Sequence, residues 1–224
     1  MPQGILAQAG GWAQGGVCRY TRCAGRGILT GRSAKEFSPF AVKRGGGCVG
    51  IIRRAVRQDL DAVALLFDRV LSEEEAGRCA IGWKRGIYPT RATAEAALEK
   101  DDLFVLEDAG RVVAAIRLNM EQVPEYSNAD WLYKAGDDEV MVAHTLVVDP
   151  ALSGRGYGRQ MIAYYEDYAR QSGCRVLRMD TNAINTRARA LYRHLGYREA
   201  GIVDCVFNGL ENVRLVCLEK KLDG

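Results

Sequence analysis

The stretch TLVVDPALSGRGYGR, from Thr145 to Arg159, decides the fold that the sequence predicts. It places an apolar strand, a turn and a glycine-rich loop directly before residues 160–170, whose apolar spacing predicts a helix. The first turn of a helix offers free backbone N–H groups and the positive end of the helix dipole. Glycines let this backbone lie close to a bulky anion. The stretch therefore predicts a site for a pyrophosphate group.

The glycine loop taken alone fits more than one class of ligand. A Rossmann dinucleotide site has a similar loop, and Asp180 could be the acidic residue that such a site places about 20 residues later. That fingerprint, however, belongs to the first strand of its domain. A P-loop is excluded because no Gly-Lys-Ser/Thr triplet follows the glycines.

The composition indicates a packed core and excludes several functional classes. The chain has 224 residues, of which 48% are hydrophobic and 26% charged, with a net charge of +3. So small a charge gives no reason to expect nucleic acid as a partner, and no apolar run reaches the length of a membrane span. The seven cysteines form no Cys-x-x-Cys pair or zinc motif, so we expect reduced thiols, no metal site and a cytoplasmic location.

Residues 1–48 differ from the rest of the chain. They are rich in glycine and hold seven Lys or Arg against one acid, Glu36. Because no hydrophobic periodicity persists, this segment buries too little surface to offset its ordering entropy, and we expect a disordered, basic extension. The abrupt change at residues 45–50 also permits the hypothesis that translation starts near Val49. The folded domain is expected over residues 49–224.

From residue 50 onward, short strands and helices alternate with clear turn signals. Two hairpins are predicted, one at the turn 108–110 and one at Asn208-Gly209. The polar and aromatic residues 121–138 form a loop long enough to suggest a function. The expected strands span residues 51–55, 103–107, 111–118, 139–148, 175–180, 201–207 and 212–219, and the expected helices span residues 59–71, 72–83, 93–100, 156–172 and 185–195.

Two motifs in the second half of the chain resemble those of the GNAT N-acetyltransferase superfamily. The family's acyl-CoA loop, Arg/Gln-x-x-Gly-x-Gly/Ala, is matched by Ser153-Gly-Arg-Gly-Tyr-Gly158. Downstream, residues 178–197 are similar to the family's "N…A…LY…LGF" segment, with Asn185 and Tyr192 at the matching positions. The resemblance covers about residues 50–220. It implies an α/β (α+β) fold in which helices flank a mixed, mainly antiparallel central sheet.

The resemblance also implies acetyl-CoA as the co-substrate. Main-chain groups of residues 146–148 would pair with the pantetheine arm, and N–H groups of residues 154–159 would hold the pyrophosphate. Ser153 departs from the family's Arg/Gln, and Arg155 and Arg159 could compensate for it. The residues expected to contact the cofactor are Leu146, Val147, Val148, Ser153, Gly154, Arg155, Gly156, Tyr157, Gly158, Arg159 and Asn185.

Acetyl transfer requires that the attacking amine lose a proton and that the departing sulfur gain one. Tyr192, which the resemblance aims at the sulfur, is the expected acid. His144 is a candidate base, because period-two alternation would put it on the face of Leu146 and its ordinary pKa of about 6.5 suits neutral pH. Glu139, at the start of the same strand, is the second candidate.

Each of these residues also has a purely structural explanation. The glycines can permit a tight turn, and Asn185 can cap a helix. Tyr192 can belong to the edge of the core, and His144 can be a hydrogen-bonded core residue. The order and spacing of the two motifs together favour the functional interpretation.

The expected function is direct transfer of an acetyl group from acetyl-CoA to a primary amine of a small-molecule or amino-acid-like substrate. One alternative is a protein N-terminal or lysine acetyltransferase, which needs an open groove between the first helices and the last hairpin. Another is a catalytically silent acyl-CoA-binding module, which Ser153 favours. A route through an acetylated cysteine lacks support, because no base is evident beside any cysteine. The resemblance also allows a homodimer.

Overall fold

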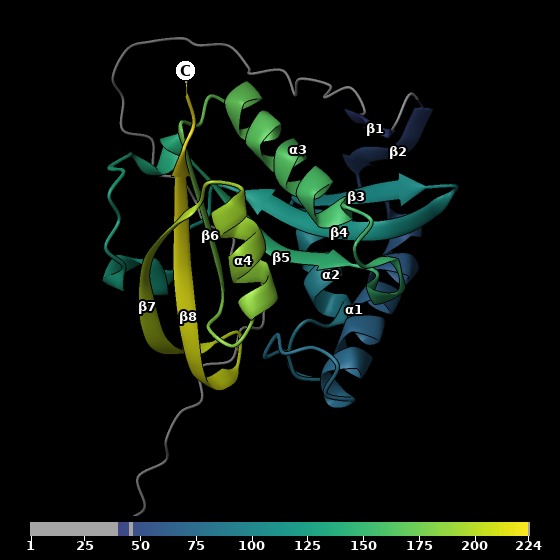
Figure 1. Ribbon diagram of the computed structural model, residues 1–224, viewed down its shortest axis with the longest axis horizontal. Helices are drawn as coiled ribbons and strands as arrows, with labels where there is room; N and C mark the ends of the chain where they lie inside the picture. Colours follow the sequence, from purple (N-terminus) through teal and green to yellow (C-terminus); the bar gives the residue numbers. More distant parts are fainter. Residues whose placement is uncertain (1–39, 45–46, 224) are drawn as a thin grey trace, which may run out of the picture. The chain divides into compact units, whose positions relative to one another are not determined.

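Eight strands of the described residues form one sheet in the order β1-β2-β3-β4-β5-β6-β8-β7 (Figure 1). The computed structural model describes residues 40–44 and 47–223. Neighbouring strands are antiparallel except for β5 and β6, which are parallel. The strands are β1 (Phe40–Arg44), β2 (Gly47–Arg54), β3 (Leu103–Asp108), β4 (Arg111–Asn119), β5 (Val140–Val148), β6 (Val176–Asn182), β7 (Arg198–Phe207) and β8 (Leu210–Lys221).

Helices cover both faces of this sheet. The helices are α1 (Leu60–Glu75), α2 (Arg91–Glu99), α3 (Tyr157–Gln171) and α4 (Thr186–His194), with short 3-10 turns η1 (Arg57–Asp59), η2 (Pro124–Asn128), η3 (Asp137–Glu139) and η4 (Pro150–Leu152). Alternate residues of β3 divide between the two layers: Phe104 and Leu106 pack with α3, whereas Leu103 and Val105 pack with α1 and α2. The sheet is thus buried on both sides, and apolar burial on both faces stabilises it. Among the helices of the described residues, none is long and apolar enough to cross a membrane.

The parallel pair β5 and β6 opens partway along its length. The two strands pair over residues 140–143 and 176–179, but β5 continues to Val148 and β6 to Asn182. The Tyr165 hydroxyl of α3 lies 2.7 Å from Met141 O and 2.9 Å from Arg178 O, where the strands are still joined. Beyond this point the two strand ends border a gap in the sheet, and this gap positions the site described below.

The long loop between β4 and β5 is packed against the sheet. Glu219 of β8 has no solvent exposure, and its carboxylate accepts hydrogen bonds from Leu132 N (2.9 Å), Tyr133 N (3.1 Å) and Arg198 Nη1 (2.5 Å). The guanidinium of Arg178 lies 4.2 Å from the centre of the Trp131 ring. These buried charges hold the loop in place, because each has partners that offset its desolvation.

Most of the predicted elements are confirmed, including both hairpins and the helices on either side of β6. The separate helix expected over residues 72–83 is wrong. Ser72 lies inside α1, which ends at Glu75, and Gly77 follows with a positive φ of 68° that a helix cannot continue. The sheet also begins before the expected boundary at residue 49, since β1 pairs with β2. The disorder expected for residues 1–39 lies outside the described residues.

Candidate active site

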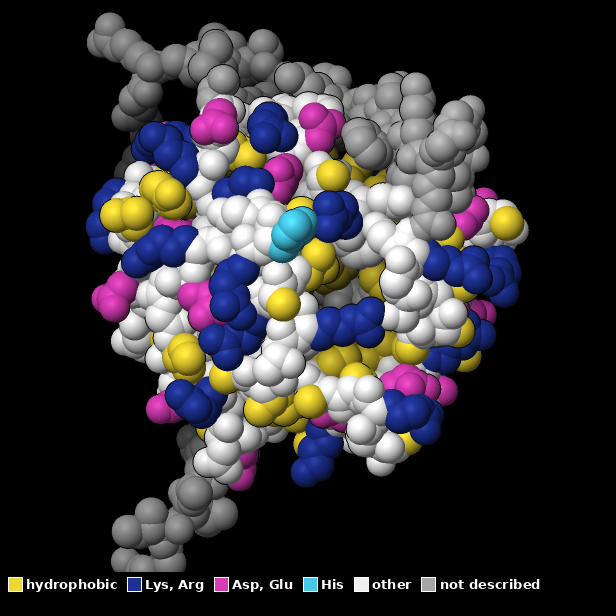
Figure 2. All heavy atoms as spheres, in the orientation of Figure 1, with side chains coloured by type: hydrophobic (Ala, Val, Ile, Leu, Met, Phe, Trp, Pro, Cys, Tyr) yellow, Lys and Arg dark blue, Asp and Glu magenta, His cyan; other side chains and the backbone are white. Residues whose placement is uncertain are grey.

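A cavity of about 860 Å³ lies where the sheet opens between β5 and β6. Its wall combines residues 145–148 of β5, residues 180–182 of β6, the segment 149–159, the N-terminal half of α4 and residues from the segment 77–88. Figure 2 shows a hollow near the middle of the drawn face, with hydrophobic side chains in its floor and Lys or Arg side chains at its rim. Residues from four regions of the chain, 70–88, 145–159, 180–192 and 207–215, meet here, as is typical of a ligand site.

One end of the cavity, which we call the anion end, is formed by residues 153–159 and Arg187. Gly154 and Gly156 have positive φ angles of 80° and 84°, and Gly156 caps α3. Because the first N–H groups of a helix lack intrahelical partners, this end of the cavity can bind an anion.

Every predicted cofactor residue except Arg155 lines this cavity. Tyr157 donates its hydroxyl hydrogen bond to Asp108. Asn185 caps α4, because its side chain accepts a hydrogen bond from Ala188 N at 3.1 Å. The structural explanation for Asn185 therefore holds, although the residue also borders the cavity. The contacts of all these residues with a cofactor stay predictions.

Arg187, on the first turn of α4, was not recognised from the sequence. It lines the cavity, and its guanidinium donates a hydrogen bond to the hydroxyl of Ser153. The family's motif places an Arg or Gln side chain at the position of Ser153, so Arg187 supplies a positive charge at this same point. The only sequence feature that could have identified Arg187 is its position two residues after Asn185. That feature becomes informative only when the loop and α4 are known to lie side by side.

The free edge of β5 forms the middle of the cavity. Leu146, Val147 and Val148 line it, and within the described sheet β5 has no strand partner beyond Ala143 on the β6 side. Main-chain groups at such an edge can pair with an extended ligand as a further strand would. This geometry fits the linear, amide-containing arm expected from the sequence.

Two titratable side chains meet the opening from opposite faces of the sheet. Tyr192 belongs to the layer of α3 and α4 and is only 7% exposed. Asp180 of β6 faces the other layer, where the hydroxyl of Tyr126 donates a hydrogen bond to its carboxylate at 2.8 Å. Both residues line the cavity. The opening can therefore present one group to each side of a ligand that passes through it.

Burial changes the protonation of both groups. Burial of the carboxyl group raises the pKa of Asp180 to about 7, against the opposing effect of the Tyr126 hydrogen bond and with a further increase from Glu125. Burial, and then the charge of Asp180, raise the pKa of Tyr192 well above its usual range. Asp180 can thus exchange a proton near neutral pH, while Tyr192 keeps its own. The sequence indicates only that Asp180 is an acidic residue near the end of a strand. Its contact with Tyr126, which belongs to a distant loop, could not be predicted from neighbouring residues.

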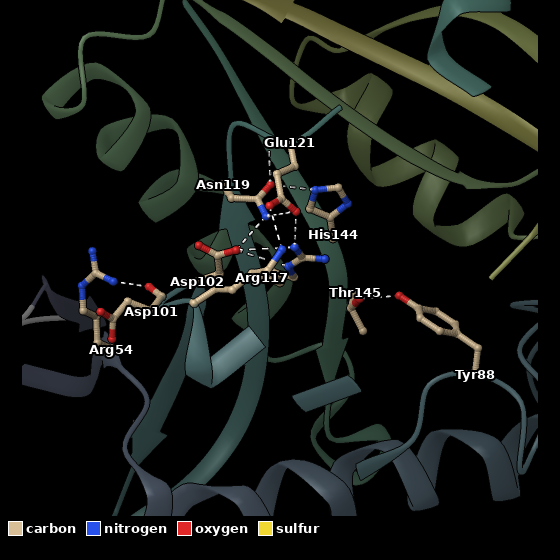
Figure 3. Close-up of polar contacts among 10 residues, drawn as sticks. Arg54, Tyr88, Asp101, Asp102, Arg117, Asn119, Glu121, His144 and Thr145 are labelled. Carbon is tan, nitrogen blue, oxygen red and sulfur yellow. Dashed lines mark hydrogen bonds and ion pairs between the residues drawn. The ribbon is translucent and has the colours of Figure 1, made fainter. Parts of the chain in front are cut away.

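His144 does not line the cavity, and a β-bulge just after it changes the alternation of β5. Thr145 has a φ of 51°, and Thr145 and Leu146 together stand opposite the single residue Ile116 of β4. His144 and Leu146 therefore point to opposite faces, and the expectation that they share a face is wrong. In Figure 3, His144 points toward Asn119, whereas Thr145 points toward Tyr88.

The surroundings of His144 are those of a hydrogen-bonded core residue. Its Nε2 lies 3.0 Å from Asn119 Oδ1, an oxygen that already accepts a hydrogen bond from Glu121 N. Burial, and then the charge of Arg117, lower the pKa of His144 to about 4. The imidazole is consequently neutral at pH 7. Its role as the base stays a prediction, but the cavity geometry gives it no support.

Glu139 lies at the end of β5 that is remote from the cavity. It is the last residue of η3 and lies six positions before Thr145, which corresponds to about 20 Å along a strand. Its carboxylate pairs with Arg175, with 2.5 Å between Oε1 and Nε, and this ion pair lowers the pKa of Glu139. Its proposed role as a base therefore also lacks geometric support.

The segment 77–88, between α1 and α2, closes the other side of the cavity. The carboxylate of Glu74 accepts hydrogen bonds from Ile81 N (2.5 Å) and Gly82 N (2.9 Å), which holds the segment against α1. A Cβ atom at Gly82 would lie 2.3 Å from Asn182 Nδ2, so a larger residue would displace the Asn182 side chain, and the φ of 83° at this position also favours glycine. The hydroxyl of Tyr88 bonds to that of Thr145 on the bulge.

The tip of the last hairpin completes this closure. A Cβ atom at Gly209 would lie 3.3 Å from Ile87 Cγ2, so the hairpin turn and the segment 77–88 are in contact. A second hollow of about 530 Å³ lies outside this contact, between residues 82–87 and 209–213. The groove that a protein acceptor would need is thus narrow at this point.

Comparison with protein families agrees with the fold and the cavity. The model of the acetyltransferase (GNAT) family matches residues 70–197. Among curated proteins, an uncharacterized N-acetyltransferase of Bacillus subtilis is 27% identical over 66% of this chain and 89% of its own length. An aminoalkylphosphonate N-acetyltransferase of Salmonella typhimurium is 25% identical over 66% of this chain and 85% of its own length.

Other matches cover less of the relative or show the fold alone. An uncharacterized N-acetyltransferase of Methanocaldococcus jannaschii is 28% identical over 47% of this chain, but the match spans only 42% of the relative. A GNAT-family structure from Streptococcus agalactiae has a TM-score of 0.66 at 18% identity, with 78% of this chain and 96% of that chain covered. A Salmonella typhimurium protein solved with acetyl-CoA as its cofactor has a TM-score of 0.57 at 20% identity, over 77% and 94% of the two chains.

Proposed function

Because the chain belongs to the acetyltransferase (GNAT) family, we propose that it transfers an acetyl group from acetyl-CoA directly to a primary amine of a small molecule. One observation carries this proposal: the sheet opens between β5 and β6, with Tyr192 on one face of the opening and Asp180 on the other. When bound, acetyl-CoA supplies the acetyl group on a thioester sulfur. The anion end, with Arg159, Arg187 and the start of α3, would hold its phosphates.

Asp180 would act as the proton acceptor and Tyr192 as the proton donor. An alkylammonium has a pKa of about 10.4, so it must lose a proton before it can attack. Asp180, with its pKa near 7, is charged at pH 8 and is placed on the face opposite the α3–α4 layer. Tyr192 remains protonated and can donate to the departing sulfur. We therefore prefer Asp180 to His144 and Glu139 as the base.

The cysteines support direct transfer rather than an acetylated enzyme. Burial raises the pKa of Cys79 and Cys174 to about 11 and that of Cys217 to about 12. The thiolate is the nucleophilic form, so these groups are poor nucleophiles at neutral pH. Initial-rate measurements with both substrates varied should give intersecting double-reciprocal lines. Parallel lines would support the cysteine route instead.

A protein acceptor is the main competing proposal. The close approach of Ile87 and Gly209 supports a small acceptor, because it narrows the groove in which a peptide would lie. The Salmonella typhimurium relative is named as an aminoalkylphosphonate N-acetyltransferase, which likewise suggests a small amine as the acceptor. The silent-module alternative rested on Ser153, and Arg187 now supplies a charge beside that residue.

Thiol release by the purified full chain tests the proposal. Acetyl-CoA is incubated with a panel of small primary amines and with peptides that have free N-termini, and mass spectrometry identifies the products. We expect acetylated small amines, and Tyr192→Phe should lower kcat by about 10- to 100-fold. Acetylated peptides alone would favour the protein acceptor. Tight CoA binding without any acetylated product would favour the silent module. A cytoplasmic location and a homodimer stay predictions from the sequence.

A further inference from the structure

The part of the cavity on the Asp180 side, which we call the acceptor end, is formed by Trp83, Tyr88, Asp180 and the wall residues Phe207, Leu210, Val213 and Leu215. Tyr88 and Phe207 pack against the buried side chains of the other three wall residues, which belong to one apolar cluster. The Trp83 ring meets the Tyr88 ring edge to face, with 5.9 Å between centroids. An acceptor on this side is therefore surrounded by hydrocarbon and aromatic rings.

Asp180 is the one charged residue that the cavity presents at this end. The other charged lining residues, within the described chain, are Glu73, Arg78, Asp149, Arg159 and Arg187. Glu73 and Arg78 pair with each other at 2.7 Å, and Arg69 neutralises Asp149. Arg159 and Arg187 belong to the anion end. The acceptor end thus offers a negative group and no cation.

Two cations outside the wall have acidic groups beside them, although the charge of Arg117 still acts on Tyr88: burial raises the pKa of Tyr88 to about 12, and Arg117 opposes this increase. Arg117 of β4 does not line the cavity, and its guanidinium pairs with Glu121 at 2.8 Å and also with Asp102. Lys84 is exposed and borders only the outer hollow, where Glu211 provides an opposite charge. A carboxylate or phosphonate inside the acceptor end would consequently lose its hydration without gaining a partner.

We propose that the acceptor is a primary amine on an uncharged apolar body, an alkylamine or arylalkylamine, and that the site rejects amines that carry a nearby carboxylate or phosphonate. This inference rests on the proposed function and deepens it. The ammonium group is attracted by the Asp180 carboxylate and by the faces of the aromatic rings. The apolar body replaces water against Phe207 and the strand residues of β8.

Three amines that share one skeleton test the role of charge. Phenethylamine, phenylalaninamide and phenylalanine differ at a single position, which carries hydrogen, a neutral amide or a carboxylate. The full chain with acetyl-CoA should acetylate the first two with a kcat/KM at least about 100-fold above that for phenylalanine, because an unpaired buried charge is strongly disfavoured. Propylamine against 2-aminoethylphosphonate repeats the comparison with a smaller body.

The outcomes separate this inference from the proposed function. If phenylalanine is acetylated within about threefold of phenethylamine, the specificity proposal is overturned while the acetyltransferase function stands. If none of the five amines is acetylated, the proposed function for small amines fails. Phenylalaninamide distinguishes charge from size, because rejection of both it and phenylalanine would show that bulk, and not charge, sets the limit.

A matched pair of variants introduces the missing cation. Phe207→Arg places a guanidinium at the wall, whereas Val206→Arg adds the same charge at the neighbouring residue, whose side chain is 62% exposed. We expect Phe207→Arg to narrow the ratio of phenethylamine to phenylalanine by about tenfold or more, and Val206→Arg to leave it unchanged. Equal ratios in both variants, in proteins that still bind CoA, would contradict the proposal.

Discussion

The main chain of the anion end comes from one continuous segment, to which only Arg187 is added from α4, whereas the acceptor end is built from side chains that are far apart in the sequence. Residues 153–159 form a loop and a helix start whose main chain can bind an anion with few side-chain requirements. Asp180, Tyr126 and Tyr88 come from a strand and two separate loops. A site for a common cofactor can therefore be formed largely by residues that are adjacent in the sequence, while a site that selects the acceptor depends on tertiary packing.

The largest expected effect lies at the acceptor end. Asp180→Asn keeps the size of the side chain but removes the proton acceptor, so kcat should fall by about 10²- to 10⁴-fold. Steady-state kinetics with a reactive amine measure this effect, and the KM for acetyl-CoA should stay within about threefold of the wild-type value. A variant that keeps more than a third of the wild-type kcat would remove Asp180 from the mechanism.

Tyr126→Phe tests whether the long loop acts through Asp180. The Tyr126 hydroxyl stabilises the carboxylate, so its loss should raise the pKa of Asp180 further above about 7. Because the base must be deprotonated, the acidic limb of the kcat/KM profile should move upward by about 1 on the pH scale. Activity should fall about fivefold at pH 7, because the deprotonated fraction of Asp180 falls from about one half to about one tenth, and it should recover by pH 9.

Tyr133→Phe is the matched control for that variant, since it removes a hydroxyl from the same loop without touching Asp180. Its pH profile should coincide with that of the wild type. A uniform loss of activity across the pH range in Tyr126→Phe would instead indicate a structural defect of the loop.

Arg187→Ala tests the anion end with a smaller expected effect. Loss of the guanidinium beside Ser153 should raise the KM for acetyl-CoA by about five- to tenfold, with kcat little changed. Arg193→Ala on the same helix is the control, because its side chain is 62% exposed and pairs only loosely with Glu199 at 4.0 Å. An unchanged KM in Arg187→Ala would show that the charge of Arg187 does not replace the Arg or Gln side chain that the family motif has at the position of Ser153.

His144→Gln should have the smallest effect. The histidine is neutral at pH 7 and bonds to Asn119 on the face opposite Leu146, so kcat should change by less than about threefold. The measurement is again the pH profile, which should keep its acidic limb near pH 7. A loss of that limb in His144→Gln would restore the histidine as the base.

Local patterns predicted much of the fold. The hairpin turns at residues 108–110 and 208–209 and the capped helix α4 follow from neighbouring residues, and the structure has them. The prediction of a helix over residues 72–83 was wrong because contacts that the local pattern does not show determine the structure of this segment. Glu74 bonds to the main chain of Ile81 and Gly82 across a non-helical segment, and this long-range support is not visible in the capping pattern.

The sequence by itself determined the family resemblance and the glycine loop of the anion end, because a glycine loop followed by a helix requires only adjacent residues, whereas the placement of Arg187 beside Ser153 required the tertiary structure. Only the tertiary structure decided the chemistry of the acceptor end. The single extra residue at Thr145 reverses the alternation of β5 and sends His144 to the other face. Burial of the Asp180 carboxyl group raises its pKa toward neutrality, while the hydrogen bond from Tyr126 opposes this increase. The physical reason is that face selection and burial depend on which distant segments pack together.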